Sequence, residues 1–224
     1  GSTASFLAAI LGASGIRVGL YSSPHLVSVR ERVRVDGMLI GEEDLAAGLT
    51  RVREQSDAAI AAGEQAGPST YFEAMTLVAF EHFRKAGASA AILEVGLGGR
   101  LDCTNIAEPV LSLVTNIALD HEDYLGQGLE NIAMEKAGVF RAGAPALTAA
   151  LEGPGLETLR QQARERGAPL KELGTCRVQI SADSWQLACG GRSVDLPLPS
   201  LCGRHQFQNA ALAVLAAWTL RDLG

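Results

Sequence analysis

Apolar positions along the chain alternate between two periodicities, which predicts a regular alternation of strands and helices. Between Thr70 and Ala86, apolar side chains recur at helical spacing, for example Phe72, Met75, Ala79 and Phe83. Further helices are expected at residues 2–13, 42–62, 129–138, 155–166 and 207–222, and strands at 17–21, 89–95, 110–116 and 145–150. Strands that alternate with helices favour an α/β domain with a doubly wound, mostly parallel sheet.

Two stretches depart from this alternation. Residues 32–40 alternate in polarity around Asp36-Gly37, a dipeptide that indicates a tight hairpin. Residues 169–197 change to short strands separated by turns, one of them at Gly190-Gly191. We expect this second stretch to be an antiparallel β extension of the sheet.

Candidate chemistry gathers where the predicted strands end. The apolar run at 90–93 ends in Glu94, and a glycine-rich turn follows it. The strand at 110–116 leads to His121, and Lys136 stands fifteen residues further on. Sites in parallel α/β sheets form at the carboxyl ends of the strands. The sequence therefore places an acid, an imidazole and a lysine where an active site is expected.

Composition narrows the class of protein. The chain has 224 residues, 47% of them hydrophobic, enough for a sizeable core. Its net charge of -6, without a basic tract, argues against nucleic acid as a partner. No apolar run approaches the roughly 18 residues of a spanning helix, so no membrane partner is expected. The four cysteines have no CxxC spacing, and they suit a reducing cytoplasm better than a disulfide or zinc framework.

The segment from Ile92 to Asn105 resembles folylpolyglutamate synthases and dihydrofolate synthases, which are members of the Mur ligase superfamily. The resemblance also includes Ser22–Leu26, Thr70–Glu73 and Gly203–Ala210, in the right order over almost the whole chain. It implies a P-loop NTPase-like fold, with residues 1–224 forming the ATP-binding central domain. It also implies an ATP-dependent ligase that joins L-glutamate to dihydropteroate or folate through an acyl phosphate. The cofactors would be ATP and Mg²⁺, and we expect a monomer.

The resemblance also assigns roles to individual residues. Ser23, Glu94 and His121 would be magnesium ligands, and Lys136, which is carbamylated in related enzymes, would act with Glu94 and His121 in catalysis. Ser2 and Thr3 would lie beside the phosphates, with Gln206 and Asn209 at the adenine. The substrate side would comprise six residues: His25, Phe72, Glu73, Arg100, Asp102 and Asn105.

Each of these residue types also has an ordinary structural explanation. Glu94 could cap the turn after its strand, and Lys136 could be a solvated helix residue. Asp102 and Asn105 could stabilise their own loop, since such side chains readily bond to nearby backbone. Glu73 could be a first-turn acid favoured by the helix dipole. Gln206 and Asn209 could cap the last helix.

By resemblance, Gly1-Ser2 ends a phosphate loop of the form Gly-Thr-Asn-Gly-Lys-Gly-Ser. We therefore expect the lysine, the strand before it and a C-terminal domain to lie outside this chain.

Alternatives to the folate-ligase reading stay open. A Mur peptide ligase of cell-wall synthesis is a near rival, and a non-catalytic nucleotide-binding fragment is a more distant one. The sequence does not distinguish dihydrofolate synthase from folylpolyglutamate synthase or from an enzyme with both activities.

Overall fold

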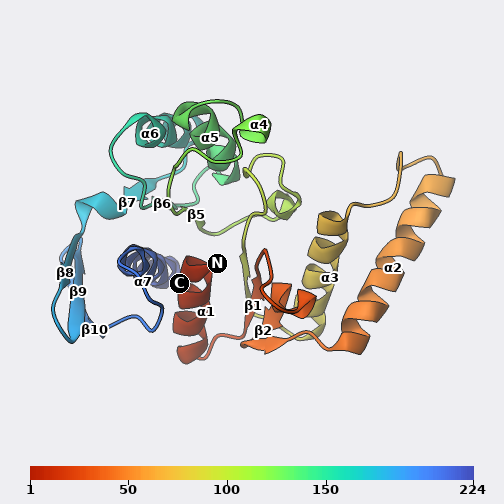
Figure 1. Cartoon of the computed structure of the whole chain (residues 1–224), viewed down its shortest axis with the longest axis horizontal. Helices are drawn as coiled ribbons and strands as arrows, with labels where there is room; N and C mark the ends of the chain where they lie inside the picture. Colours follow the sequence, from red (N-terminus) through yellow and green to blue (C-terminus); the bar gives the residue numbers. More distant parts are fainter. The chain divides into compact units, whose positions relative to one another are not determined.

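The computed structural model describes residues 1–224 as an α/β protein with two compact units (Figure 1). The first unit contains residues 3–96 with Gly1, and the second contains residues 97–224 with Ser2. No helix has both the length and the apolar composition that crossing a bilayer requires.

The first unit is built on a four-stranded mixed sheet in the order β3-β2-β1-β4. Its strands are β1 (Val18–Tyr21), β2 (Val33–Val35), β3 (Met38–Leu39) and β4 (Ala90–Leu93). β1 pairs in parallel with β4 and antiparallel with β2. All four residues of β1 are buried, as expected for a strand covered on both faces.

The predicted hairpin is confirmed between β2 and β3. Val35 pairs with Met38, so Asp36 and Gly37 are the two turn residues. Both have positive φ, 51° and 79°, which is the signature of a type I′ turn.

Helices α1 (Ser2–Ala13), α2 (Glu42–Ala61) and α3 (Tyr71–Lys85) complete this unit, together with the 3-10 turn η1 (Val29–Arg32). Figure 1 shows α2 and α3 side by side, and the two helices contact each other along their length. The core combines strand residues such as Tyr21 and Val33 with Met75, Val78 and Phe83 of α3. The amphipathic pattern from Thr70 onward thus marks the helix that covers the sheet.

The second unit contains a three-stranded parallel sheet in the order β5-β6-β7. These strands are β5 (Ser112–Val114), β6 (Ala146–Thr148) and β7 (Leu170–Glu172). The connections contain α4 (Glu122–Leu125), α5 (Leu129–Lys136), α6 (Pro154–Arg166) and three 3-10 turns, namely η2 (Cys103–Ile106), η3 (Ala137–Val139) and η4 (Leu173–Thr175).

Helices cover both faces of this parallel sheet. In Figure 1, α5 and α6 lie on one side of it and α7 (His205–Leu223) on the other. Ala133, Ala137, Leu156 and Leu159 pack with Ala146 of β6 in one core cluster. The doubly wound α/β prediction is therefore confirmed.

The expected antiparallel extension is wrong in two details. β7 pairs in parallel with β6, because α6 returns the chain to the same end of the sheet. The strands β8 (Arg177–Ile180), β9 (Ser184–Cys189) and β10 (Arg192–Pro197) form a separate antiparallel sheet in the order β10-β9-β8. Alternation and turn signals predict strands, but they do not say which sheet a strand joins.

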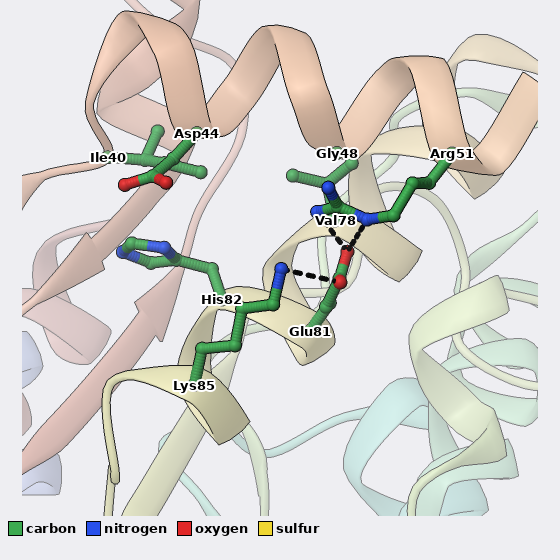
Figure 2. Close-up of a pocket in the computed structure, with 8 residues that line it drawn as sticks. All are labelled: Ile40, Asp44, Gly48, Arg51, Val78, Glu81, His82 and Lys85. Carbon is green, nitrogen blue, oxygen red and sulfur yellow. Dashed lines mark hydrogen bonds and ion pairs between the residues drawn. The ribbon is translucent and has the colours of Figure 1, made fainter.

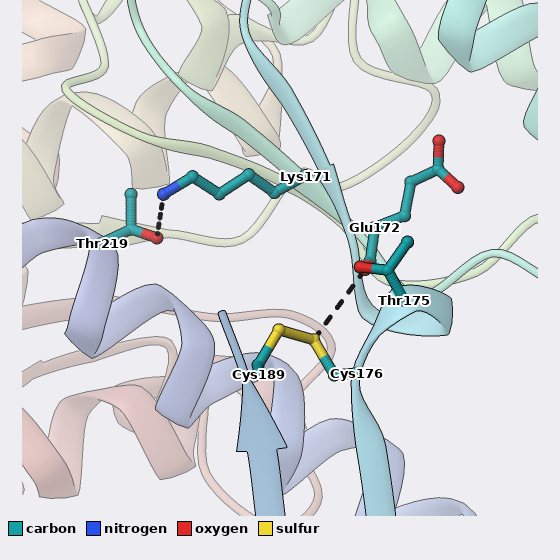
Figure 3. Close-up of a disulfide and its surroundings, with 6 residues drawn as sticks. All are labelled: Lys171, Glu172, Thr175, Cys176, Cys189 and Thr219. Atoms are coloured by element: carbon teal, nitrogen blue, oxygen red, sulfur yellow. Dashed lines mark hydrogen bonds between the residues drawn. A yellow bond between two sulfur atoms is a disulfide. The ribbon is translucent and has the colours of Figure 1, made fainter. Parts of the chain in front are cut away.

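The cysteine pattern is expected to suit a reducing cytoplasm better than a disulfide framework, and the structure differs from this for one pair. Cys176, directly before β8, forms a disulfide with Cys189, the last residue of β9 (Figure 3). Arg177 lies opposite Ala188 in the antiparallel register. The residues next to this pair, Cys176 and Cys189, therefore face each other, and their Cα atoms are 4.6 Å apart. Strand register created this proximity, which linear spacing does not reveal. Cys103 and Cys202 take no part in a disulfide.

Candidate functional site

The Glu94 carboxylate joins three segments of the first unit. It follows β4 directly and is only partly exposed. One oxygen, Oε1, accepts a hydrogen bond from the amino group of Gly1, at the start of α1. The other, Oε2, accepts the backbone N–H of Ser23 at 3.1 Å. Of the predicted metal ligands, the structure thus places Glu94 and Ser23 together.

The start of α1 has the properties of an anion site. Gly1 is its N-cap and supplies no side-chain cap. Free N–H groups and the helix dipole favour negative charge at such a position. Ser2 and Thr3, the predicted phosphate neighbours, open this helix, and Thr3 is buried.

The loop after β1 is shaped by an acid that the sequence reasoning missed. Glu31 accepts the backbone N–H groups of Leu26, Val27 and Ser28, at 2.9, 3.0 and 2.7 Å. Three such donors stabilise the ionised form, and they lower the pKa of Glu31 from its ordinary value of 4.5 to about 2. The signal was readable, because Ser28 and Glu31 form a capping box at the start of η1.

His25 lies in the same loop and has its own partner. Arg32 Nε donates to His25 Nδ1 at 2.9 Å, and the Arg32 guanidinium lies 5.3 Å from the centre of the Tyr71 ring. Arg32 is thus a second residue that sequence reasoning did not single out. No spacing rule would have joined it to His25.

Phe72 and Glu73 open α3 with different surroundings. The Phe72 ring packs against Tyr21, with ring centres 5.7 Å apart, and a Cβ on Gly96 would come within 2.5 Å of that ring. Phe72 therefore fits closely against the backbone at Gly96. Glu73 accepts hydrogen bonds from the backbone N–H and the hydroxyl of Thr70, and these bonds lower its pKa. Glu73 thus forms a capping box with Thr70 at the start of α3.

The predicted substrate residues of the glycine-rich loop are engaged within the second unit. Asp102 caps η2, accepting the N–H and hydroxyl of Thr104 and the N–H of Leu97. Arg100 bonds the Glu135 carboxylate at 2.9 and 3.0 Å. Asn105 donates to the carbonyls of Arg100 and Gly138. These contacts support the structural explanation for the three side chains, since they hold the loop in place.

The same loop touches the backbone around Lys136. The Arg100 N–H donates to the Glu135 carbonyl at 2.9 Å. A Cβ on Gly99 would come within 2.9 Å of that carbonyl oxygen, and a Cβ on Gly138 would come within 2.4 Å of the Arg100 Cα. Only residues without a Cβ allow the two backbones to pack this closely. Arg141 strengthens the junction by donating to the side-chain oxygen of Asn105 at 2.8 Å.

Lys136, the last residue of α5, is partly buried. Burial lowers its pKa below the ordinary value, although Asp120 acts in the opposite direction. This confirms the expected semi-apolar setting. Asp120 also lies 3.6 Å from His121 Nε2, and His121 is exposed in a left-handed conformation before α4. Asp120, His121 and Lys136 are therefore brought together within the second unit.

At the start of α7, Gln206 is buried and its side-chain oxygen accepts a hydrogen bond from Asn209 at 3.0 Å. The two predicted adenine residues thus contact each other on one turn of the helix.

The oxygen donors beside β4 suit magnesium better than a softer metal. Mg²⁺ takes one or two carboxylates and completes its shell with water and phosphate. Glu94 with the neighbouring Ser23 fits that pattern, and no group of three or more His, Cys, Asp or Glu side chains is arranged to hold a metal by itself.

One surface hollow lies away from these residues. It is a shallow hollow with room for about 10 Å³, and it lies between α2 and α3 (Figure 2). Arg51 and Lys85 both pair with Glu81 there, so its main charges are already neutralised. None of the predicted site residues lines it, and we assign it no ligand.

Comparison with known proteins gives a consistent set of relatives. The family model of the Mur ligase middle domain matches residues 53–217. The dihydrofolate synthase/folylpolyglutamate synthase of Bacillus subtilis (strain 168) is 34% identical over an alignment 224 residues long, which covers 97% of this chain and 52% of that protein. Escherichia coli FolC in complex with DHPP and ADP has 40% identity and a TM-score of 0.84, over 97% of this chain and 50% of that one.

A second solved structure adds a different set of bound molecules. It is a bifunctional folylpolyglutamate synthase/dihydrofolate synthase with Mn, AMPPNP and L-glutamate bound. Identity is 40% and the TM-score is 0.81, over 97% of this chain and 50% of that one. The chain thus spans about half the length of the relatives it matches.

Proposed function

Because the chain belongs to the Mur ligase family through its middle domain, we propose that it carries the ATP-binding part of a ligase joining L-glutamate to dihydropteroate or folate. The relatives support this activity, since they are named for it and their structures contain ADP or AMPPNP. The observation that carries the proposal is the placement of Glu94 and Ser23 at the start of α1.

Glu94 and Ser23 hold Mg²⁺ in this proposal, and His121 joins them as the third ligand. Magnesium supplies charge neutralisation on the phosphates when it is bound. The backbone N–H groups at the start of α1, at Ser2 and Thr3, receive phosphate oxygens. Gln206 and Asn209 lie on the adenine side.

Phosphoryl transfer converts the substrate carboxylate into an acyl phosphate. The L-glutamate amine then attacks the acyl carbon, an amide bond forms and inorganic phosphate leaves. Lys136 carries a carbamate in the active enzyme, which converts a cation into a pair of oxygen donors. Its lowered pKa supports this assignment, because only the neutral amine reacts with carbon dioxide.

His25, Phe72 and Glu73 border the pteroyl substrate in the first unit. In the second unit, Arg100, Asp102 and Asn105 lie on the substrate side and also hold the glycine-rich loop, since Asp102 bonds within it and the other two bond to Glu135 and Gly138. The proposed location is the cytoplasm. The proposed oligomeric state is a monomer, which light scattering would test.

The test is phosphate release by the full-length enzyme that contains this chain. We expect turnover with ATP, L-glutamate and dihydropteroate or a folate, and none with a muropeptide acceptor. Turnover with the muropeptide alone would favour the cell-wall ligase. Nucleotide binding without turnover on any acceptor would favour the non-catalytic fragment.

A further inference from the structure

The hydrogen bond between Arg32 and His25 fixes more than a ring position. A guanidinium has five N–H donors and no acceptor, so Nδ1 of His25 must offer its lone pair to Arg32 Nε, 2.9 Å away. A neutral imidazole carries one proton on its two nitrogens. With Nδ1 used as the acceptor, that proton lies on Nε2.

We propose that Arg32 is a positioning residue that holds His25 as the Nε2–H tautomer, so that the loop after β1 presents a hydrogen-bond donor to an acceptor atom of the bound substrate. The identity of that ligand, a pteroyl compound, rests on the proposed function. The tautomer itself rests only on contacts within the first unit.

Arg32 is itself well held. Its guanidinium lies over the Tyr71 ring at 5.3 Å, within the range of a cation–π interaction. Tyr71 is the first residue of α3, and Arg32 is the last residue of η1. Two segments far apart in the chain therefore converge on the arginine that orients the ring.

The backbone of the loop is held independently of the ring. Glu31 accepts three backbone N–H groups of residues 26–28, and those bonds do not involve Arg32. The loop can therefore keep its path when the Arg32 side chain is changed. This separation allows the orientation of His25 to be tested without unfolding the loop.

With its proton on Nε2, His25 acts as a donor at that nitrogen and not as a base. The expected contribution is to substrate binding, seen in KM, with little effect on kcat. A ligand group that can only donate would find no partner there.

The first test is imidazole ¹⁵N NMR of the 224-residue chain, at a pH where histidine is neutral. His25 should show a single tautomer with Nε2 protonated. Arg32→Met keeps the apolar stem but removes the donor, and it should give a mixture of tautomers. Arg32→Lys keeps a donor-only cation and should restore the single form. Arg30→Met is the matched control, because Arg30 pairs with Glu42 instead. A protonated Nδ1, or an unchanged His25 spectrum in Arg32→Met, would overturn the proposal.

The second test uses the full-length enzyme. His25→Leu should raise KM for the pteroyl substrate about tenfold, the effect of one lost hydrogen bond, whereas His25→Gln keeps an N–H and should stay within about twofold. Equal KM values for His25→Leu and wild type would refute the donor role. An enzyme inactive on all pteroyl acceptors would refute the proposed function, yet the NMR result would still decide the tautomer.

Discussion

At the scale of single residues, the two oxygens of Glu94 have different partners, and each partner comes from a different segment. The Gly1 amino group forms an ion pair with one oxygen, and the Ser23 N–H donates to the other, so both groups stabilise the negative charge. A carboxylate held in this way is prepared for a cation that adds to its remaining lone pairs.

Glu94→Gln should therefore leave the fold intact and lower turnover of the full-length enzyme roughly a hundredfold, because the amide keeps the shape but not the charge. Steady-state phosphate release at saturating Mg²⁺ measures the effect. Near-normal turnover would exclude the metal role, and a large drop in Tm would show that Glu94 serves the fold instead.

Lys136 should carry a carbamate in the active enzyme. Lys136→Ala should lower turnover about a hundredfold, and short carboxylic acids should restore part of it by replacing the missing oxygens. Labelled bicarbonate should give a carbamate ¹³C signal that disappears in the variant. Lys85→Ala is the matched control, since Lys85 forms only an exposed pair with Glu81. A wild-type spectrum without the signal would contradict the prediction.

Glu31 makes the stability of the loop depend on pH. Its pKa falls from 4.5 to about 2 on folding, so its contribution is complete above about pH 4.5. As the pH falls toward 2, the contribution is lost. In urea unfolding, the free energy of unfolding of wild type should exceed that of Glu31→Gln above pH 4.5, and this difference should shrink as the pH falls from 4.5 to 2. The control is Glu43→Gln on α2, and an advantage that persists at pH 2 would contradict the assignment.

At the scale of elements, the glycine-rich loop and the α5–η3 turn behave as one packed unit. Gly99 and Gly138 allow their backbones to meet, and Arg100 and Asn105 bond across the contact. The position of Lys136 therefore depends on a loop that precedes it by thirty residues or more.

Gly138→Ala should break this contact, because the added Cβ would lie 2.4 Å from the Arg100 Cα. Backbone atoms cannot move away from such a clash as a flexible side chain can. We expect a loss of about 1–3 kcal/mol in the free energy of unfolding, measured with urea. Gly174→Ala is the matched control, since nothing lies within 4 Å of the added carbon. Equal stability of the two variants would show that the junction relaxes freely.

At the scale of the whole molecule, none of the lysines stands in a Gly-x-x-x-x-Gly-Lys-Ser/Thr sequence. Such a lysine reaches the β and γ phosphates in P-loop enzymes. We therefore expect the 224 residues alone to release no phosphate from ATP with any acceptor. The full-length enzyme, assayed beside it, should do so. Equal turnover by both proteins would refute this expectation.

The sequence by itself determined the order of strands and helices, the Asp36-Gly37 hairpin and the strand-end position of Glu94. These features depend on neighbours in the chain, through apolar periodicity, turn chemistry and capping. The resemblance over ordered motifs indicated the family, which the match to residues 53–217 confirmed.

Only the tertiary structure decided which distant groups meet. It paired Cys176 with Cys189 and separated β8–β10 from the parallel sheet. It also directed Arg100 and Asn105 to Glu135 and Gly138, and Asp102 to Thr104 of its own loop. It also placed Arg32 against His25 and Tyr71. The physical reason is that strand register, side-chain direction and burial are settled when the elements pack, and local sequence does not encode those contacts.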